Sequence, residues 1–298
     1  MLATYWDGVD DFVAMVDVSP EGYTSAERAT GLDYDHTAGI LKILAQFHAL
    51  SLAFKEQQPE NFEKAATSLK VLLMISPTNS NNLFQETYFS ERLRPWYSNF
   101  QKNVFVVNRD AVEKELPPEY LHKLNKLIDN DLYGVLIKSC VARGPLSVVT
   151  HGDVWVPNFL FKYQGSKPGR ITVIDFQLAR YSSLTTDLLF FLFSCVDPDL
   201  VKDKWDDLIA LYHQTLLESM KKYGAKGTVT LDALQAEIKK YSCLGVGMSM
   251  EALIMSQLED DEVSDVDGIE VSFGVKVVCF IEHVVLRVMR PFLWKVCG

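Results

Sequence analysis

Short apolar runs between turn residues predict strands at two places in the chain. Near the start, residues 2–6 and 12–18 flank an Asp-Gly turn. In the middle, the β-branched run 146–149 is followed by residues 159–163 and 170–175, which flank a polar segment containing Gly and Pro. Two such runs around a turn-forming segment are typical of a β-hairpin.

Periodic apolar positions predict helices in most of the remaining chain. From Asp33 onward, apolar residues recur at i, i+3, i+4 and i+7, the period of one buried helical face. These positions are Ile40, Ile43, Leu44 and Phe47. Residues 82–102, residues 118–142 and the chain after residue 184 show further helical patterns. The expected fold class is therefore α+β, with a small β start, a mostly helical body and a central β-hairpin.

The composition limits the kinds of partner and compartment. Lys and Arg number 29 against 39 Asp and Glu, a net charge of −10 without any basic run, so neither nucleic acid nor an anionic membrane is an expected partner. The five cysteines are scattered without a CxxC pair, which is typical of reduced thiols in a cytoplasmic protein. The most apolar tract, residues 273–294, contains several charged residues, so no membrane span is expected.

Residues 151–187 hold the arrangement that points to chemistry. Asp153 follows a His-Gly pair, Asn158 lies five residues later, and Asp175 follows an apolar strand seventeen residues after Asn158. Because both ends of a hairpin lie on the same side, Asp175 is expected beside the Asp153–Asn158 segment. Phosphoryl transfer from ATP requires a carboxylate that accepts the proton of the attacking hydroxyl, and oxygen ligands for Mg²⁺. Asp153 can supply the first, and Asn158 and Asp175 the second.

Each of these residues also has an ordinary interpretation. A single Asp among 39 acidic residues is most often a solvated surface group, and a single Asn is most often a turn residue. The order of strand, His-Gly-Asp, Asn, hairpin and Asp-Phe favours phosphoryl transfer over coincidence. A metallohydrolase built on His151, Asp153 and Asp175 is the weaker alternative, because no further His occurs between His151 and His213.

Several motifs resemble those of the ecdysteroid-kinase-like family, the choline-kinase-like (CHK) phosphotransferases related to choline and aminoglycoside kinases. The chain reads HGDVWVPN from His151 to Asn158, IDFQLARY from residue 174 and DLL from Asp187. Residues 31–49 resemble the first helix of the family's large lobe, and residues 16–23 resemble its hinge. The resemblance covers essentially the entire chain.

The resemblance implies a protein-kinase-like fold and an activity. Residues 1–18 would be a two-stranded remnant of the small lobe with the hinge, and residues 19–298 would be the mostly helical C-terminal lobe. The implied reaction is transfer of the γ-phosphoryl group of ATP, with Mg²⁺, to the hydroxyl of a small organic molecule, steroid-like or another alcohol. Gly152 stands where protein kinases have Arg, which agrees with a kinase that needs no phosphorylated activation loop.

The resemblance also implies roles for individual residues. Asp153 would be the catalytic base, and Asn158 and Asp175 would be the Mg²⁺ ligands. His151 would support the catalytic loop. Asp187 would anchor the same loop by accepting hydrogen bonds from its backbone.

The hinge carries the main departure from the family. The backbone of Val16, Asp17 and Val18 would contact the adenine of ATP. A kinase of this type has, before its hinge, a glycine-rich phosphate loop and a lysine that holds the phosphates. Here only fifteen residues precede Val16, and the first lysine is Lys42. We therefore expect a truncated chain that is weakly active or inactive alone; the alternative is a catalytically inactive pseudokinase that binds a ligand or a partner.

Overall fold

The computed structural model describes residues 3–5, 12–27, 31–72, 94–114, 117–141 and 143–257. In these residues, helices and small sheets combine in an α+β fold, as the sequence predicts. The elements, in chain order, are β1 (Ala3–Tyr5), β2 (Phe12–Ala14), the 3-10 helix η1 (Ser19–Glu21), β3 (Tyr23–Ser25), α1 (Tyr34–Gln57), α2 (Pro59–Leu72), α3 (Arg94–Val112), α4 (Pro118–Asp129), α5 (Leu132–Val141), β4 (Ser147–Thr150), the 3-10 helix η2 (Val156–Asn158), β5 (Phe159–Gln164), β6 (Lys167–Val173), β7 (Arg180–Ser183), α6 (Leu184–Ser194), α7 (Pro198–Lys222) and α8 (Leu231–Gln257).

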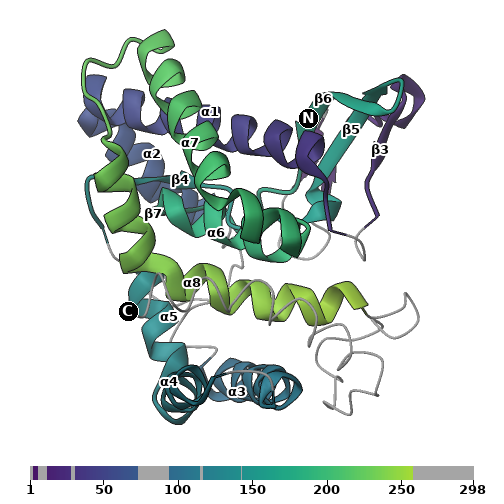
Figure 1. The fold of residues 1–298 in the computed structure, drawn as a ribbon. Coiled ribbons are helices and arrows are strands. Elements are labelled where there is room, and N and C mark those ends of the chain that lie inside the picture. Colours follow the sequence, from purple (N-terminus) through teal and green to yellow (C-terminus); the bar gives the residue numbers. More distant parts are fainter. Residues whose placement is uncertain are drawn as a thin grey trace.

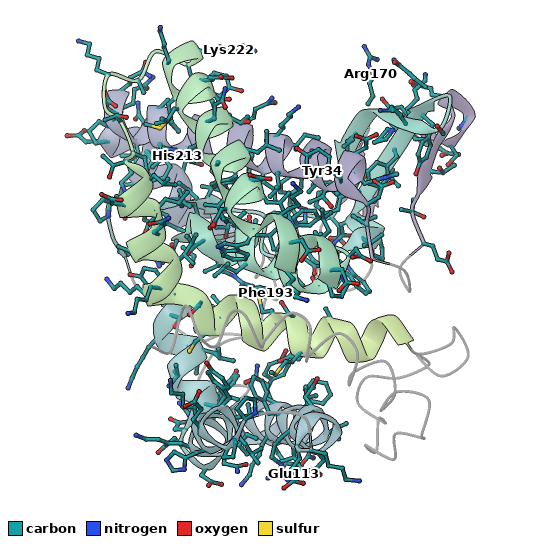
Figure 2. The ribbon with its side chains drawn as sticks, in the orientation of Figure 1. Tyr34, Glu113, Arg170, Phe193, His213 and Lys222 are labelled. Carbon is teal, nitrogen blue, oxygen red and sulfur yellow. The ribbon has the colours of Figure 1, made fainter. Side chains whose placement is uncertain are left out.

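Helix α8 runs between two groups of helices (Figure 1). Helices α1, α6 and α7 lie on one side of α8, and α3, α4 and α5 lie on the other. Helix α6 is central to the core, because every residue from Leu184 to Phe193 is buried. A helix that is apolar on all sides needs cover on all sides. Charged side chains such as Arg170 of β6 and Lys222 of α7 project from the rim of the molecule (Figure 2).

Helix α1 begins where the sequence predicts. The side chain of Asp33 accepts a hydrogen bond from the backbone N–H of His36, which caps the first turn. By length and apolar composition alone, α1 could cross a membrane. In this fold its apolar face lies in the core, where Ile40, Leu41 and Leu44 are almost completely buried and the helix packs against α7.

The C-terminal half of α1 also holds strand β4. The ammonium group of Lys55 donates to the carbonyl oxygens of Gly144 and Ser147, both at 3.2 Å. One turn earlier, the hydroxyl of Ser51 accepts a hydrogen bond from the backbone N–H of Val149 at 3.3 Å. Strand β4 is therefore tied to α1 at its start and at its middle.

Two sheets bring distant segments together. β5 and β6 form the predicted antiparallel hairpin, with Phe159 opposite Val173, and β3 pairs antiparallel with the other edge of β5. β4 pairs antiparallel with β7, with Thr150 opposite Arg180. Residues 151–158 and residues 174–179 therefore connect the same two sheets, and both ends of each segment are fixed by strand pairing.

The structure corrects several boundaries. The second strand ends at Ala14, so residues 15–18 are not strand, and Val18 instead precedes η1, whose first turn contains Pro20. β6 begins at Lys167 and not near residue 170, because Gly165 takes a left-handed φ of 64° and allows a tight turn.

The helical expectations change as well. The pattern at 118–142 contains two helices, α4 and α5, and not one. Helix α3 starts at Arg94 and continues to Val112, ten residues beyond the expected end at residue 102. Residues 82–93 of that prediction, and the chain beyond residue 257, lie outside the described residues. Strands β3 and β7 and helix α2 were not predicted.

Candidate active site

Two short segments form the candidate site. After the roles expected from the sequence, we call residues 151–158 the catalytic loop and residues 174–179 the metal loop. Their backbones are joined, because the N–H of Ile174 donates to the carbonyl oxygen of Asn158 at 3.0 Å. This bond continues the β5–β6 pairing by one step and places Asp175 next to the end of the catalytic loop. The structure thus brings Asp175 beside the Asp153–Asn158 segment, as the hairpin argument requires.

Asp153 and Asn158 are in direct contact. The side-chain nitrogen Nδ2 of Asn158 donates to the carbonyl oxygen of Asp153 at 2.9 Å and to its carboxylate oxygen Oδ2 at 3.0 Å. Burial raises the pKa of Asp153 above its ordinary value, and the negative charge of Asp175 acts in the same direction. The hydrogen bond from Asn158 opposes this shift without cancelling it. A carboxylate with a raised pKa is a stronger proton acceptor than an ordinary one, provided that it is ionised.

His151 bridges the two loops. Its Nε2 lies 2.8 Å from the carbonyl oxygen of Ile174, and its Nδ1 lies 3.2 Å from the backbone nitrogen of Asp153. A neutral imidazole that carries its proton on Nε2 satisfies both contacts, donating to the carbonyl and accepting from the N–H. Its ring also packs on Phe176, with centroids 4.5 Å apart. Both ring nitrogens are engaged by the protein backbone, so His151 is unsuited to bind a metal here.

Asp187 lies beneath the catalytic loop. Its carboxylate oxygens accept hydrogen bonds from the backbone N–H groups of His151 at 2.7 Å and Gly152 at 2.9 Å. The residue is buried, and burial by itself would raise its pKa. The hydrogen bond from His48, electrostatic attraction to His48 and His151, and the hydrogen bond from Gly152 together outweigh burial and hold the pKa of Asp187 below its ordinary value. Asp187 is therefore an ionised acceptor fixed under the loop.

Asp175 has an unusual backbone conformation. Its φ is 62°, and it is the one non-glycine residue among the described residues with a positive φ. Aspartate tolerates this region better than most residues, at some cost in energy. Its side chain is exposed, and Oδ1 lies 3.4 Å from the backbone nitrogen of Gln177. The conformation leaves the carboxylate accessible at the edge of the loop pair.

Gly152 is a site residue whose steric role the sequence did not indicate. Its φ is 84°, and a Cβ atom at this position would lie 1.9 Å from the carbonyl oxygen of Leu178. No side chain fits between the two loops at this point. The fold therefore excludes an arginine at this position on steric grounds.

The proposed hinge residues lie apart from this cluster of contacts. Val16 is 55% exposed, and the side chain of Asp17 accepts a hydrogen bond from the backbone N–H of Ser19 at 2.9 Å. In the described part of the chain, the hydrogen bonds of Val16, Asp17 and Val18 do not reach the catalytic loop or the metal loop. The structure joins Asp153, Asn158, Asp175, His151 and Asp187, and leaves the hinge residues outside that network.

The oxygen atoms of this site suit Mg²⁺ better than a transition metal. Among the described residues, no group of three or more His, Cys, Asp or Glu side chains is placed to hold a metal ion. Mg²⁺ does not need such a cage, because it usually binds one or two protein oxygens together with phosphate oxygens and water. The accessible carboxylate of Asp175 and the side-chain carbonyl of the adjacent Asn158 are oxygen donors of this kind.

Comparison with known proteins identifies the family. The model of the ecdysteroid kinase-like family matches residues 2–225, a span that contains both loops and Asp187. A search of curated proteins found no match. The matched span is well over half of the 298 residues. This confirms the resemblance seen in the sequence: the chain belongs to the ecdysteroid kinase-like family.

Proposed function

We propose that this chain is the catalytic part of a small-molecule kinase that transfers the γ-phosphoryl group of ATP to a hydroxyl. The observation that carries the proposal is the junction of the two loops. One side chain, Asn158, orients the carboxylate of Asp153, while its backbone carbonyl holds the segment that presents Asp175. A proton acceptor and two oxygen ligands then lie together, the set that this reaction uses.

Asp153 acts as the base in this proposal. As the hydroxyl oxygen of the acceptor forms its bond to the γ-phosphorus, the bond between that phosphorus and the β,γ-bridging oxygen breaks. The electron pair leaves with ADP, and the hydroxyl proton passes to the carboxylate of Asp153. The raised pKa of Asp153 favours this proton transfer.

Asn158 and Asp175 are the proposed Mg²⁺ ligands. When bound with ATP, Mg²⁺ would neutralise charge on the phosphate oxygens. The residues of the chain fix where this happens: Asn158 through its bonds to Asp153, and Asp175 through its φ of 62°. His151 keeps the two loops at a constant separation, because it bonds to both.

The family and the fold suggest the remaining assignments. Residues 19–298 would form a kinase-like C-terminal lobe, and residues 1–18 would carry part of the small lobe and the hinge that contacts adenine. A cytoplasmic small organic alcohol, steroid-like or cationic, is the proposed acceptor, since the net charge of −10 also favours a cation. These assignments rest on the family relationship and on composition.

The test combines binding with turnover. The chain is titrated with Mn²⁺ and with the Mn²⁺–nucleotide complex, and then incubated with ATP, Mg²⁺ and a panel of steroid and cationic alcohols. ADP release and the phosphorylated product are both measured. We expect Asp153→Asn to lower kcat by several orders of magnitude with nearly unchanged nucleotide affinity, and Asp175→Ala to abolish metal binding and turnover together.

Asp203, an exposed residue of α7, provides the matched control. Asp203→Asn removes one carboxylate far in sequence from both loops and should alter neither binding nor turnover. If Asp153→Asn abolishes nucleotide binding, Asp153 is a metal ligand and the assigned roles are wrong. Nucleotide binding without any phosphorylated product would favour a pseudokinase. Absence of both metal and nucleotide binding would contradict the proposal.

A further inference from the structure

A buried row of three side chains connects helix α7 to the catalytic loop. The hydroxyl of Tyr212 lies 2.7 Å from Nδ1 of His48, and Nε2 of His48 lies 3.1 Å from Oδ2 of Asp187. Asp187 in turn accepts from the backbone of the catalytic loop. Tyr212 and His48 are 0% exposed and Asp187 is 1% exposed, so these bonds are shielded from bulk solvent.

One arrangement of protons on His48 satisfies all of these hydrogen bonds. Asp187 is an acceptor, so Nε2 of His48 must carry a proton to donate. Burial and the charge of Asp187 raise the pKa of Tyr212 well above its ordinary value, so its hydroxyl keeps its proton. Within the described residues, the hydroxyl of Tyr212 has no acceptor besides Nδ1 of His48. Nδ1 accepts that proton when it carries none itself, which is the arrangement on which the proposal below is based.

Oxygen Oδ2 of Asp187 serves two donors at once. It accepts from Nε2 of His48 and from the backbone N–H of His151, while Oδ1 accepts from Gly152. The bond from His48 therefore helps to fix the orientation of the Asp187 carboxylate, and with it the two hydrogen bonds from the catalytic loop. The Gly152 peptide precedes Asp153 directly and has a φ of 84°, so its orientation determines where the base points.

Helix α1 touches the other loop as well. The ring of Phe47, the neighbour of His48, packs edge-on against Phe176 with centroids 5.8 Å apart. Phe176 follows Asp175 and packs on His151. Two adjacent residues of α1 thus contact the two loops: His48 bonds to Asp187 below Asp153, and Phe47 packs on Phe176 beside Asp175.

We propose that His48 is a positioning residue for Asp153, acting through Asp187, and that Tyr212 holds His48 in the neutral form with its proton on Nε2. The proposal deepens the kinase assignment above, because it concerns the same base. Its structural part, the state of His48 and the anchoring of the loop, can be measured whether or not the chain turns over substrate.

The experiment uses the full chain labelled with ¹⁵N. Long-range imidazole spectra at pH 7 should show His48 as neutral with the proton on Nε2. His48→Leu removes the donor, and we expect about tenfold faster hydrogen exchange at the amides of His151 and Gly152, the loss of one hydrogen bond. His48→Gln should restore protection, because its amide donates to Asp187 and its carbonyl accepts from Tyr212. Where turnover is measurable, His48→Leu should lower kcat about 100-fold at nearly constant nucleotide KM, and His48→Gln should recover most of it.

Tyr212→Phe keeps the buried aromatic ring but removes the hydrogen bond to Nδ1 of His48. We therefore expect the spectra to show a mixture of His48 tautomers in place of a single one. Tyr97→Phe is the control, because it deletes a buried hydroxyl that bonds Glu251 and not His48. An imidazolium His48 in the parent at pH 7, or His48→Gln amides as unprotected as those of His48→Leu, would overturn the inference. A parent chain that binds neither metal nor nucleotide but gives the expected spectra would refute the kinase assignment alone.

Discussion

Nitrogen Nδ2 of Asn158 lies within hydrogen-bond distance of both the carbonyl oxygen and the carboxylate of Asp153, at 2.9 and 3.0 Å. One amide group therefore faces Asp153 with its nitrogen, and its oxygen is the atom that we propose as a metal ligand. The two functions proposed for Asn158 can be separated, since aspartate retains the oxygen donors and loses the N–H donor.

We predict that Asn158→Asp binds Mn²⁺ at least as tightly as the parent and has a kcat about 10- to 100-fold lower. The new carboxylate cannot donate to Asp153 and repels it. Metal titration and steady-state kinetics on one preparation test this. Asn158→Ala is the comparison variant, which should lose both tight metal binding and turnover. Unchanged kcat in Asn158→Asp would show that the amide does not orient the base.

The pH dependence of turnover should reflect the environment of Asp153. Burial raises its pKa, so the acidic limb of the kcat profile should lie above the ordinary aspartate value of 3.8. Activity should increase as pH rises through this pKa, because the ionised form is the base. Asn158→Asp adds a like charge and should move the limb to higher pH. A limb at or below 3.8, or its movement to lower pH in Asn158→Asp, would contradict the assignment.

Gly152 and Gly165 form a matched pair for testing the fit between the two loops. Both have positive φ, but a Cβ at Gly152 would lie 1.9 Å from the carbonyl oxygen of Leu178, whereas Gly165 has open space around it. We expect Gly165→Ala to lower the free energy of unfolding by about 1 kcal/mol, from backbone strain alone. Gly152→Ala should cost about 2–5 kcal/mol, since the loops must also separate. Equal losses in urea unfolding would mean that the loops are not in contact.

Glu251 provides a test of stability against pH. This residue of α8 accepts hydrogen bonds from the hydroxyl of Tyr97 and from Nε2 of Gln101, both on α3. Burial raises the pKa of Glu251 to about 7 from 4.5, although the two hydrogen bonds oppose the shift. The folded chain therefore binds a proton that the unfolded chain releases. The resulting stability is present below about pH 4.5 and is lost as pH rises to about 7.

Glu251→Gln has no carboxyl group to titrate, so its stability should decline less than that of the parent between pH 5 and pH 7.5. Urea unfolding at several pH values measures this difference. Parallel stability curves for the two proteins would show that Glu251 titrates normally.

The catalytic cluster could be predicted from the sequence because its geometry is local. A hairpin between Asn158 and Asp175 needs only two apolar runs and a turn, and the strands found there differ from the expected ones by a few residues. The start of α1 at Asp33 could be predicted for the same reason, because the cap and the first helical turn are adjacent in sequence.

The long-range partners could not be predicted in this way. Strand β3 has three residues, and nothing in so short a run identifies β5, more than a hundred residues away, as its partner. His48 lies on an apolar helical face, where a histidine is most often a packed core residue. Its hydrogen-bond partners, Asp187 and Tyr212, lie 139 and 164 residues further along the chain. Burial and pairing of this kind become visible only when the elements are assembled.

Helix α1 holds β4 through Lys55 and Ser51, and through His48 and Asp187 it is connected to His151 and Gly152, which follow the same strand. Lys55 and His48 are seven residues apart, about two turns or roughly 10 Å along one side of the helix. Because these bonds tie the site to α1 at several points, we expect the two to move as a single rigid body. In the proposed kinase, we expect the motion that admits a substrate or releases a product to occur in elements packed around this unit. Substitutions in those elements should then change access without disturbing the alignment of Asp153.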